Sequence, residues 1–232
     1  MWSPTTLEVL QAMTVALADS VPQRCNALFI HGAPIRDNEL DKLVAKKAAA
    51  LQLSGQVGTV IINGLNAETC RNKNLAYGGF ESMFAYLLNE NVVTENILVM
   101  TPSPHTGAES RNLLTLATEN AWTRLAIMSH PHHQLRCFLQ IIALMSEVGY
   151  WPNVYNIPGP GIDWNRPIEK PVMAGETVTG GKNISGTLPT HIEEELTRIV
   201  TYAQQPEIVN GNPKFTRNAT LPEMFEYLSQ RN

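Results

Sequence analysis

Cysteine is scarce in this chain. Among its 232 residues the cysteines are Cys25, Cys70 and Cys137, and none of them belongs to a C-x-x-C pair. Three widely spaced cysteines suit neither a disulfide framework nor a thiolate zinc site, because both need paired thiols. Unpaired cysteines are typical of a reducing compartment, so we expect a cytoplasmic protein.

Charge is also sparse, and long apolar runs are absent. Charged residues make up 16% of the chain and the net charge is -4, so no basic stripe is available for a nucleic-acid backbone. The N-terminal segment carries Glu8 and Asp19 and has no basic leader. No window reaches the roughly 18 consecutive apolar residues that a membrane span needs. We therefore expect neither a nucleic-acid partner nor a membrane segment.

The common catalytic and nucleotide-binding fingerprints are missing as well. The chain contains no G-x-S-x-G nucleophile motif, no glycine-rich phosphate loop with its lysine and no G-x-G-x-x-G fingerprint. Nothing in the sequence therefore marks a covalent catalyst, and both an enzyme and a binding protein remain open.

What the chain does contain is an alternation of apolar runs and helical segments. Apolar runs that end in glycine or small polar residues predict buried strands at 26–31, 58–64, 96–103, 124–130 and 154–159. Helical spacing predicts helices at 5–18, 38–53, 79–89, from 106 onward, 134–148, 189–204 and 221–230, with Asn38 capping the second. This order is typical of an α/β fold, a Rossmann-like parallel sheet of about five strands flanked by helices.

The size of the chain predicts a single domain over 1–232. Its Rossmann-like core occupies 26–160, and a C-terminal loop and helical extension at 161–232 packs on that core. Residues 175–186 are rich in glycine, threonine and serine, which predicts an exposed loop.

Polar residues follow the predicted strands at their carboxyl ends. They are His31-Gly32, Asn63-Gly64, 101–106 and 129–133. Ligands of open parallel sheets bind at this edge, where loops lead into helix N-termini. Helices that begin near Thr106 and His133 would direct free N–H groups and positive dipole ends towards the crevice. We therefore expect the partner to be an anionic or nucleotide-like small molecule.

The segment SHPHHQLR, residues 129–136, contains three of the six histidines. His133 and Arg136 stand three residues apart in a first helical turn, so they share a face and suit one anionic group. The alternative is a metal held by His130, His132 and His133, as in a metal-dependent hydrolase. The segment has no carboxylate and the chain has no H-E-x-x-H motif, so we do not expect a metal.

SHPHHQLR resembles the T-S-x-Y-H-x-x-R segment of the YdcF-like family, a domain of unknown function that also includes the SanA and ElyC proteins. Further family landmarks follow in order over about half the chain, roughly 27–157, and HTGAESRN at 105–112 resembles the family's N-T-x-E-N stretch. The matching positions are Gly32, Asn63, Gly64, Glu81, Thr106, Glu109, Asn112, Ser129, His133 and Arg136. His130 and His132 depart from the family, which has a small hydroxyl residue and an aromatic residue there.

The resemblance implies a Rossmann-like domain with these residues at the ligand site. The soluble branch similar to YdcF is associated with S-adenosylmethionine binding, whereas SanA and ElyC members have a membrane segment. One expectation is an enzyme acting on a nucleotide-like or phosphorylated small molecule. In it Arg136 and helix N-termini hold the anion, His133 is the acid or base, and Glu109 orients His133. The other expectation is a non-catalytic sensor or accessory protein that only binds such a ligand.

Several of these positions also have purely structural explanations. Thr106-x-x-Glu109 has the form of a capping box, which stabilises a helix by about 0.5–2 kcal/mol without any ligand. Glu81 stands near a helix start, where a carboxylate complements the helix dipole. Asn63 and Gly64 suit a turn as well as a close approach of backbone to ligand.

Overall fold

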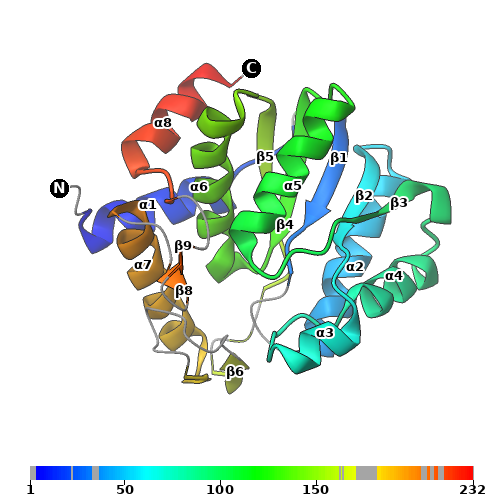
Figure 1. Cartoon of the computed structure of the whole chain (residues 1–232), viewed down its shortest axis with the longest axis horizontal. Coiled ribbons are helices and arrows are strands. Elements are labelled where there is room, and N and C mark those ends of the chain that lie inside the picture. The colour runs from blue at the N-terminus through cyan, green and yellow to red at the C-terminus, as the bar shows by residue number, and fades with distance from the viewer. Residues whose placement is uncertain are drawn as a thin grey trace.

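The fold is seen in a computed structural model, which describes residues 4–21, 23–32, 37–161, 163, 165–170, 182–204, 208–209, 212–213 and 217–231. Its centre is a five-stranded sheet with the strand order β3-β2-β1-β4-β5 (Figure 1). All four strand pairs in this sheet are parallel. The Rossmann-like α/β prediction is therefore confirmed.

The five strands match the predicted apolar runs closely. They are β1 (Cys25–Ile30), β2 (Val57–Asn63), β3 (Ile97–Met100), β4 (Arg124–Ser129) and β5 (Asn153–Pro158). The predicted strand 96–103 was too long, because β3 ends at Met100. Pro102, which has no N–H to donate to a neighbouring strand, lies in the segment that leaves the sheet.

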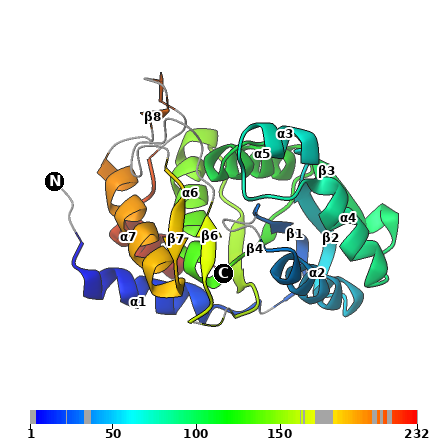
Figure 2. The same cartoon turned by 90° about the horizontal axis from the view of Figure 1, so that it is seen from below.

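Helices cover both faces of the sheet (Figure 2). On one face, α2 (Asn38–Leu53) and α4 (Phe80–Asn89) pack with apolar side chains of β1 and β2. On the other face lie α5 (Thr106–Glu119) and α6 (Pro131–Val148), and α1 (Thr6–Leu17) joins the same hydrophobic cluster. The connections α3 (Ala67–Asn72) and η1 (Thr94–Asn96) are short.

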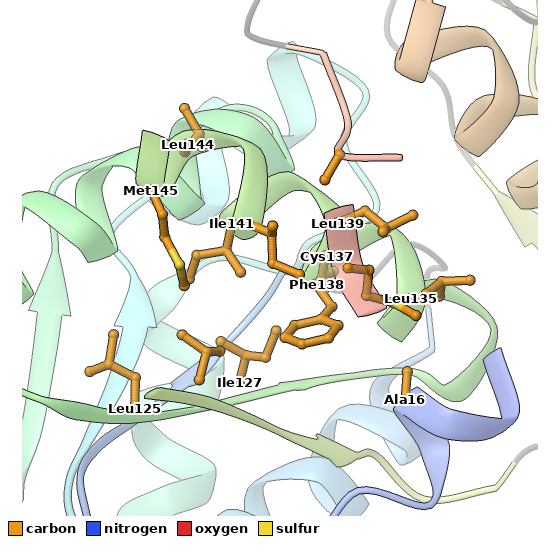
Figure 3. Packing of buried hydrophobic residues seen from close by; sticks show 14 of the residues in the cluster. Ala16, Leu125, Ile127, Leu135, Cys137, Phe138, Leu139, Ile141, Leu144 and Met145 are labelled. Atoms are coloured by element: carbon orange, nitrogen blue, oxygen red, sulfur yellow. The ribbon is translucent and has the colours of Figure 1, made fainter. Parts of the chain in front are cut away.

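Helix α6 is the most deeply buried of the described helices and supplies much of the core. Figure 3 shows Phe138, Ile141 and Met145 of α6 over Leu125 and Ile127 of β4. All five side chains are fully buried. Burial of one such side chain contributes about 1.5–3 kcal/mol, so this contact fixes α6 firmly against β4.

The start of α6 and the caps of α2 and α5 differ from the prediction. Helix α6 begins at Pro131 rather than at 134, because proline at the first helical position has the required φ and no N–H to lose. Helix α2 is capped by Asp37 and not by Asn38. Helix α5 is capped by His105, whose Nδ1 accepts from the Ala108 N–H at 3.1 Å, so the predicted capping box is wrong.

The C-terminal extension contributes helices α7 (Leu188–Gln204) and α8 (Leu221–Gln230), in agreement with prediction, and α7 packs on α6. It also forms two short antiparallel pairs, β6 (Ile168–Lys170) with β7 (Ile184–Gly186) and β8 (Ile208–Val209) with β9 (Asn212–Pro213). The prediction of a loop at 175–186 is therefore wrong for 184–186, which form β7. Residues 175–181 lie outside the described residues. None of the described helices is long and apolar enough to cross a membrane.

Candidate functional site

The strand order reverses between β1 and β4. From β1 the chain builds outward through β2 to β3, and it then returns to place β4 and β5 on the other side of β1. Ligands of doubly wound sheets bind outside the carboxyl ends of the strands at such a switch point. Here that place is formed by His31 and Gly32 after β1 and by Ser129 and His130 at the end of β4.

Glu109 organises one side of the switch point. It lies in the first turn of α5, is 4% exposed, and reaches back to the sheet. Its carboxylate accepts from His31 Nδ1 at 2.9 Å, from the Gly32 N–H at 3.0 Å and from Asn63 Nδ2 at 2.7 Å. Burial raises the pKa of Glu109, but these hydrogen bonds and the charge of His31 outweigh it, so the pKa lies below its ordinary value. Glu109 is therefore an anion that ties β1 and β2 to α5.

Asn63 is fully engaged within the protein. Its Nδ2 also donates to the Ser103 carbonyl at 2.7 Å, and its Oδ1 accepts from the N–H groups of Leu65 and Ser103 at 3.1 and 3.0 Å. The hydroxyl of Tyr77 donates to the Asn63 carbonyl at 3.0 Å. Asn63 thus fixes the loops after β2 and β3, which is a positioning role.

Gly64 also has a structural role, because a Cβ at this position would lie 2.0 Å from the carbonyl oxygen of Met100. We expect Gly64→Ala to lower the free energy of unfolding by about 3 kcal/mol or more, since the obstacle is backbone of a neighbouring strand. Urea denaturation measures the change. Gly78→Ala is the matched control, because the nearest atom to its Cβ is the Ser82 hydroxyl at 3.9 Å. Equal stabilities of the two variants would contradict the structural role.

The second turn of α6 brings a buried thiol into the site. Cys137 is fully buried. Burial raises the pKa of its thiol, but the neighbouring His133 and His31 outweigh that effect and lower it to about 6. In turn, burial lowers the pKa of His31, while Cys137 and Glu109 raise it to about 10. Together these shifts favour a charge chain of three groups, the Glu109 carboxylate, the His31 imidazolium and the Cys137 thiolate.

The sequence alone did not single out Cys137 as a site residue. The signal was present in the spacing, because His133 and Cys137 are four residues apart and so share a helix face.

His133 belongs to a second buried charge group, centred on Glu195 of α7. His133 Nδ1 lies 3.0 Å from Glu195 Oε2, and Arg136 Nε donates to the same oxygen at 2.6 Å. Lys170 of β6 donates to the other oxygen at 2.6 Å. Burial lowers the pKa of Lys170 to about 7 against the attraction of Glu195. The expectation that Glu109 orients His133 is wrong, because Glu195 occupies that position.

Of the remaining predicted residues, Thr106 lies at the site, whereas Glu81 and Asn112 stabilise the surrounding structure. The hydroxyl of Thr106 is 3.4 Å from His133 Nε2. Glu81 is exposed and accepts from the Ala67 N–H at 3.1 Å, which joins the starts of α3 and α4 outside the buried cluster. Asn112 donates to the Ser103 hydroxyl at 2.8 Å and thereby holds the loop before α5. The residues that the structure brings together at the edge are Gly32, Asn63, Thr106, Glu109, Ser129, His133 and Arg136.

Three buried polar atoms at the switch point make no hydrogen bond to the residues that the structure describes. They are Nε2 of His31, the hydroxyl of Ser129 and Nδ1 of His130. Burial and the nearby His133 lower the pKa of His130 to about 4, so its ring is neutral. A buried polar group that makes no hydrogen bond costs about 1–3 kcal/mol, and such groups point to a ligand or a bound water.

Comparison with known proteins assigns no family. No family model matches the chain, and no curated protein does. The resemblance to YdcF-like proteins stays a hypothesis, and the chemistry of the site has to carry the functional argument.

The histidine-rich turn does not form a metal centre in the described part of the chain, where no group of three His, Cys, Asp or Glu side chains is placed to hold an ion. The rings of His130 and His132 meet edge to face with their centroids 5.9 Å apart. The metal-dependent hydrolase therefore gains no support from the geometry of these residues.

Proposed function

We propose that this protein binds a nucleotide-like or phosphorylated small molecule in the crevice between the carboxyl ends of β1 and β4. The observation that carries the proposal is the group of unsatisfied polar atoms there, among them Ser129 Oγ and His130 Nδ1. A hydroxyl and a neutral imidazole suit the hydroxyl and ring-nitrogen groups of a ribose or a base. S-adenosylmethionine is one candidate, and the YdcF-like order of motifs supports it.

Helix N-termini supply the attraction for the anionic part of the ligand. Helices α6 and α5, of 18 and 14 residues, both begin at this edge, and the first turn of α6 has no acidic residue. Their N–H groups and positive dipole ends favour a phosphate or carboxylate. Arg136 contributes less than its sequence position suggests, because Glu195 already holds its guanidinium.

A catalytic role is the second candidate. The thiol of Cys137, whose pKa is lowered to about 6, and the imidazole of His133 are groups of nucleophilic and acid-base catalysis. Both stand in the first two turns of α6, which begins at the proposed crevice. Cys137 is 0% exposed, so a substrate would reach it only after the edge opens. The three cysteines of the protein are free thiols, which supports a reducing, cytoplasmic setting.

A thermal-shift screen tests the proposal with S-adenosylmethionine, adenosine monophosphate, ribose 5-phosphate and divalent metals. A bound ligand raises the unfolding midpoint by mass action. We expect a shift for the wild type that becomes smaller in Ser129→Ala and His130→Phe. Ser146→Ala is the matched control, because it changes an exposed serine at the far end of α6.

Equal shifts in all four proteins, or no shift with any organic ligand, would contradict the proposed site. A shift with a metal alone that disappears in His130→Phe would favour the metal-dependent alternative.

A further inference from the structure

A groove opens between α1 and α7, and its wall reaches Pro131 and His132 at the start of α6. Its volume is about 280 Å³, and its walls include Leu10, Met13 and Leu17 of α1 and Leu188 and Ile192 of α7. The hydroxyl of Thr14, also in the wall, donates to the Leu10 carbonyl at 2.9 Å. The groove is thus almost entirely apolar.

His132, at the start of α6, is the other polar side chain in the wall. It is 2% exposed, and neither ring nitrogen has a hydrogen-bond partner among the described residues. Burial and the nearby His130 hold its pKa well below the ordinary value, so the ring is neutral, with one N–H donor and one acceptor nitrogen. A buried side chain with both polar atoms unsatisfied is rare in folded proteins and points to a missing partner.

The size of the groove limits what this partner can be. An apolar cavity of about 150 Å³ accommodates one benzene ring. A groove of about 280 Å³ therefore has room for two fused rings. Its apolar walls would leave a charged ligand without compensation, so the ligand should be neutral.

We propose that the groove binds a neutral molecule the size of a fused bicyclic aromatic, whose hydroxyl group forms a hydrogen bond with His132. The rings lie among the side chains of α1 and α7, and the imidazole turns towards the groove as the ligand enters. Side-chain rotations of this kind are common on binding. The proposal does not depend on the function of the switch-point site.

Calorimetric titration of the full chain with 2-naphthol tests this inference, with naphthalene and 2-naphthoate as comparison ligands. We expect saturable one-site binding of 2-naphthol, and weaker binding of naphthalene by about tenfold, the usual effect of one lost hydrogen bond. 2-Naphthoate should also bind more weakly. His132→Phe should reduce the affinity for 2-naphthol to that for naphthalene and leave naphthalene binding unchanged.

Two further variants control for folding and position. Ile192→Trp fills the groove and should abolish binding of both ligands. Leu7→Trp, on the same helix α1 but 65% exposed and outside the groove, should bind both as the wild type does.

Absence of saturable binding by the wild type, equal wild-type affinities for 2-naphthol and naphthalene, or unchanged binding in Ile192→Trp would overturn the proposal. Sedimentation provides one more decisive outcome. A wild-type dimer that Ile192→Trp dissociates would mean that a second copy of the chain fills the groove instead.

Discussion

Replacement of Glu195 by alanine is expected to lower the free energy of unfolding by about 3–5 kcal/mol, the usual cost of removing one partner of a buried ion pair. Glu195 is 1% exposed and receives hydrogen bonds from Arg136 and Lys170, both at 2.6 Å. Without the carboxylate these cations stay buried and lose their shared anion. The loss should also weaken the link between β6 and α7, where Lys170 would keep only its bond to Glu194 Oε2 at 2.7 Å.

Urea denaturation of the variant beside Glu193→Ala measures this effect. Glu193 is exposed on the same helix, so its replacement should change stability by no more than about 0.5 kcal/mol. Equal stabilities of the two variants would show that the buried ion pairs of Glu195 contribute nothing to the free energy of unfolding.

The difference in unfolding free energy between the wild type and Glu195→Ala should depend on pH in a defined way. Burial raises the pKa of Glu195, but Arg136, Lys170 and His133 outweigh it and hold the pKa well below 4.5. A carboxylate with a lowered folded pKa stabilises fully above its unfolded pKa, and this contribution is lost as the pH falls towards the folded value. The difference between the wild type and Glu195→Ala should therefore be full near pH 7 and shrink below about pH 4.5.

The thiol of Cys137 is expected to titrate near pH 6, about three pH units below an ordinary thiol at 9.0. The cause is its position between His133 and His31, which favours the thiolate over the protonated thiol. Thiolate absorbance near 240 nm, followed from pH 4 to pH 11, measures the midpoint. One thiolate per chain should be present at pH 8.

The other thiols do not obscure this signal, because burial raises the pKa of Cys25 to about 12 and that of Cys70 to about 11. Cys137→Ser should remove the step near pH 6. Glu109→Gln should move the midpoint upward, because the variant loses the carboxylate that supports the charge on His31. A wild-type midpoint near pH 9 would contradict the charge chain.

The sheet and most helices were predictable from the sequence because local signals specify them. Apolar runs gave the five strands, and the carboxyl edge followed from their parallel order. The grouping of Gly32, Asn63 and Glu109 is also a consequence of that edge, since each stands at the end of a strand, just after one, or in the first turn of the following helix.

The sequence did not predict which carboxylate contacts which histidine. Glu195 is 59 residues from Arg136 and lies on α7, whose packing against α6 has no local signature. Lys170 belongs to a three-residue strand too short to show a pattern. His105 rather than Thr106 caps α5, because an imidazole nitrogen can accept the N–H three residues ahead, here that of Ala108, as a capping hydroxyl does.

The central claim, a ligand at the switch point, is tested most directly by NMR of the chain with ¹⁵N-labelled histidines. The six histidine signals are assigned by single substitutions, and the protein is titrated with S-adenosylmethionine and with adenosine monophosphate. We predict saturable shifts of His130 and His133 with at least one ligand, and an unchanged His191. No shift of His130 with either ligand, or shifts confined to His132 and His191, would contradict the claim.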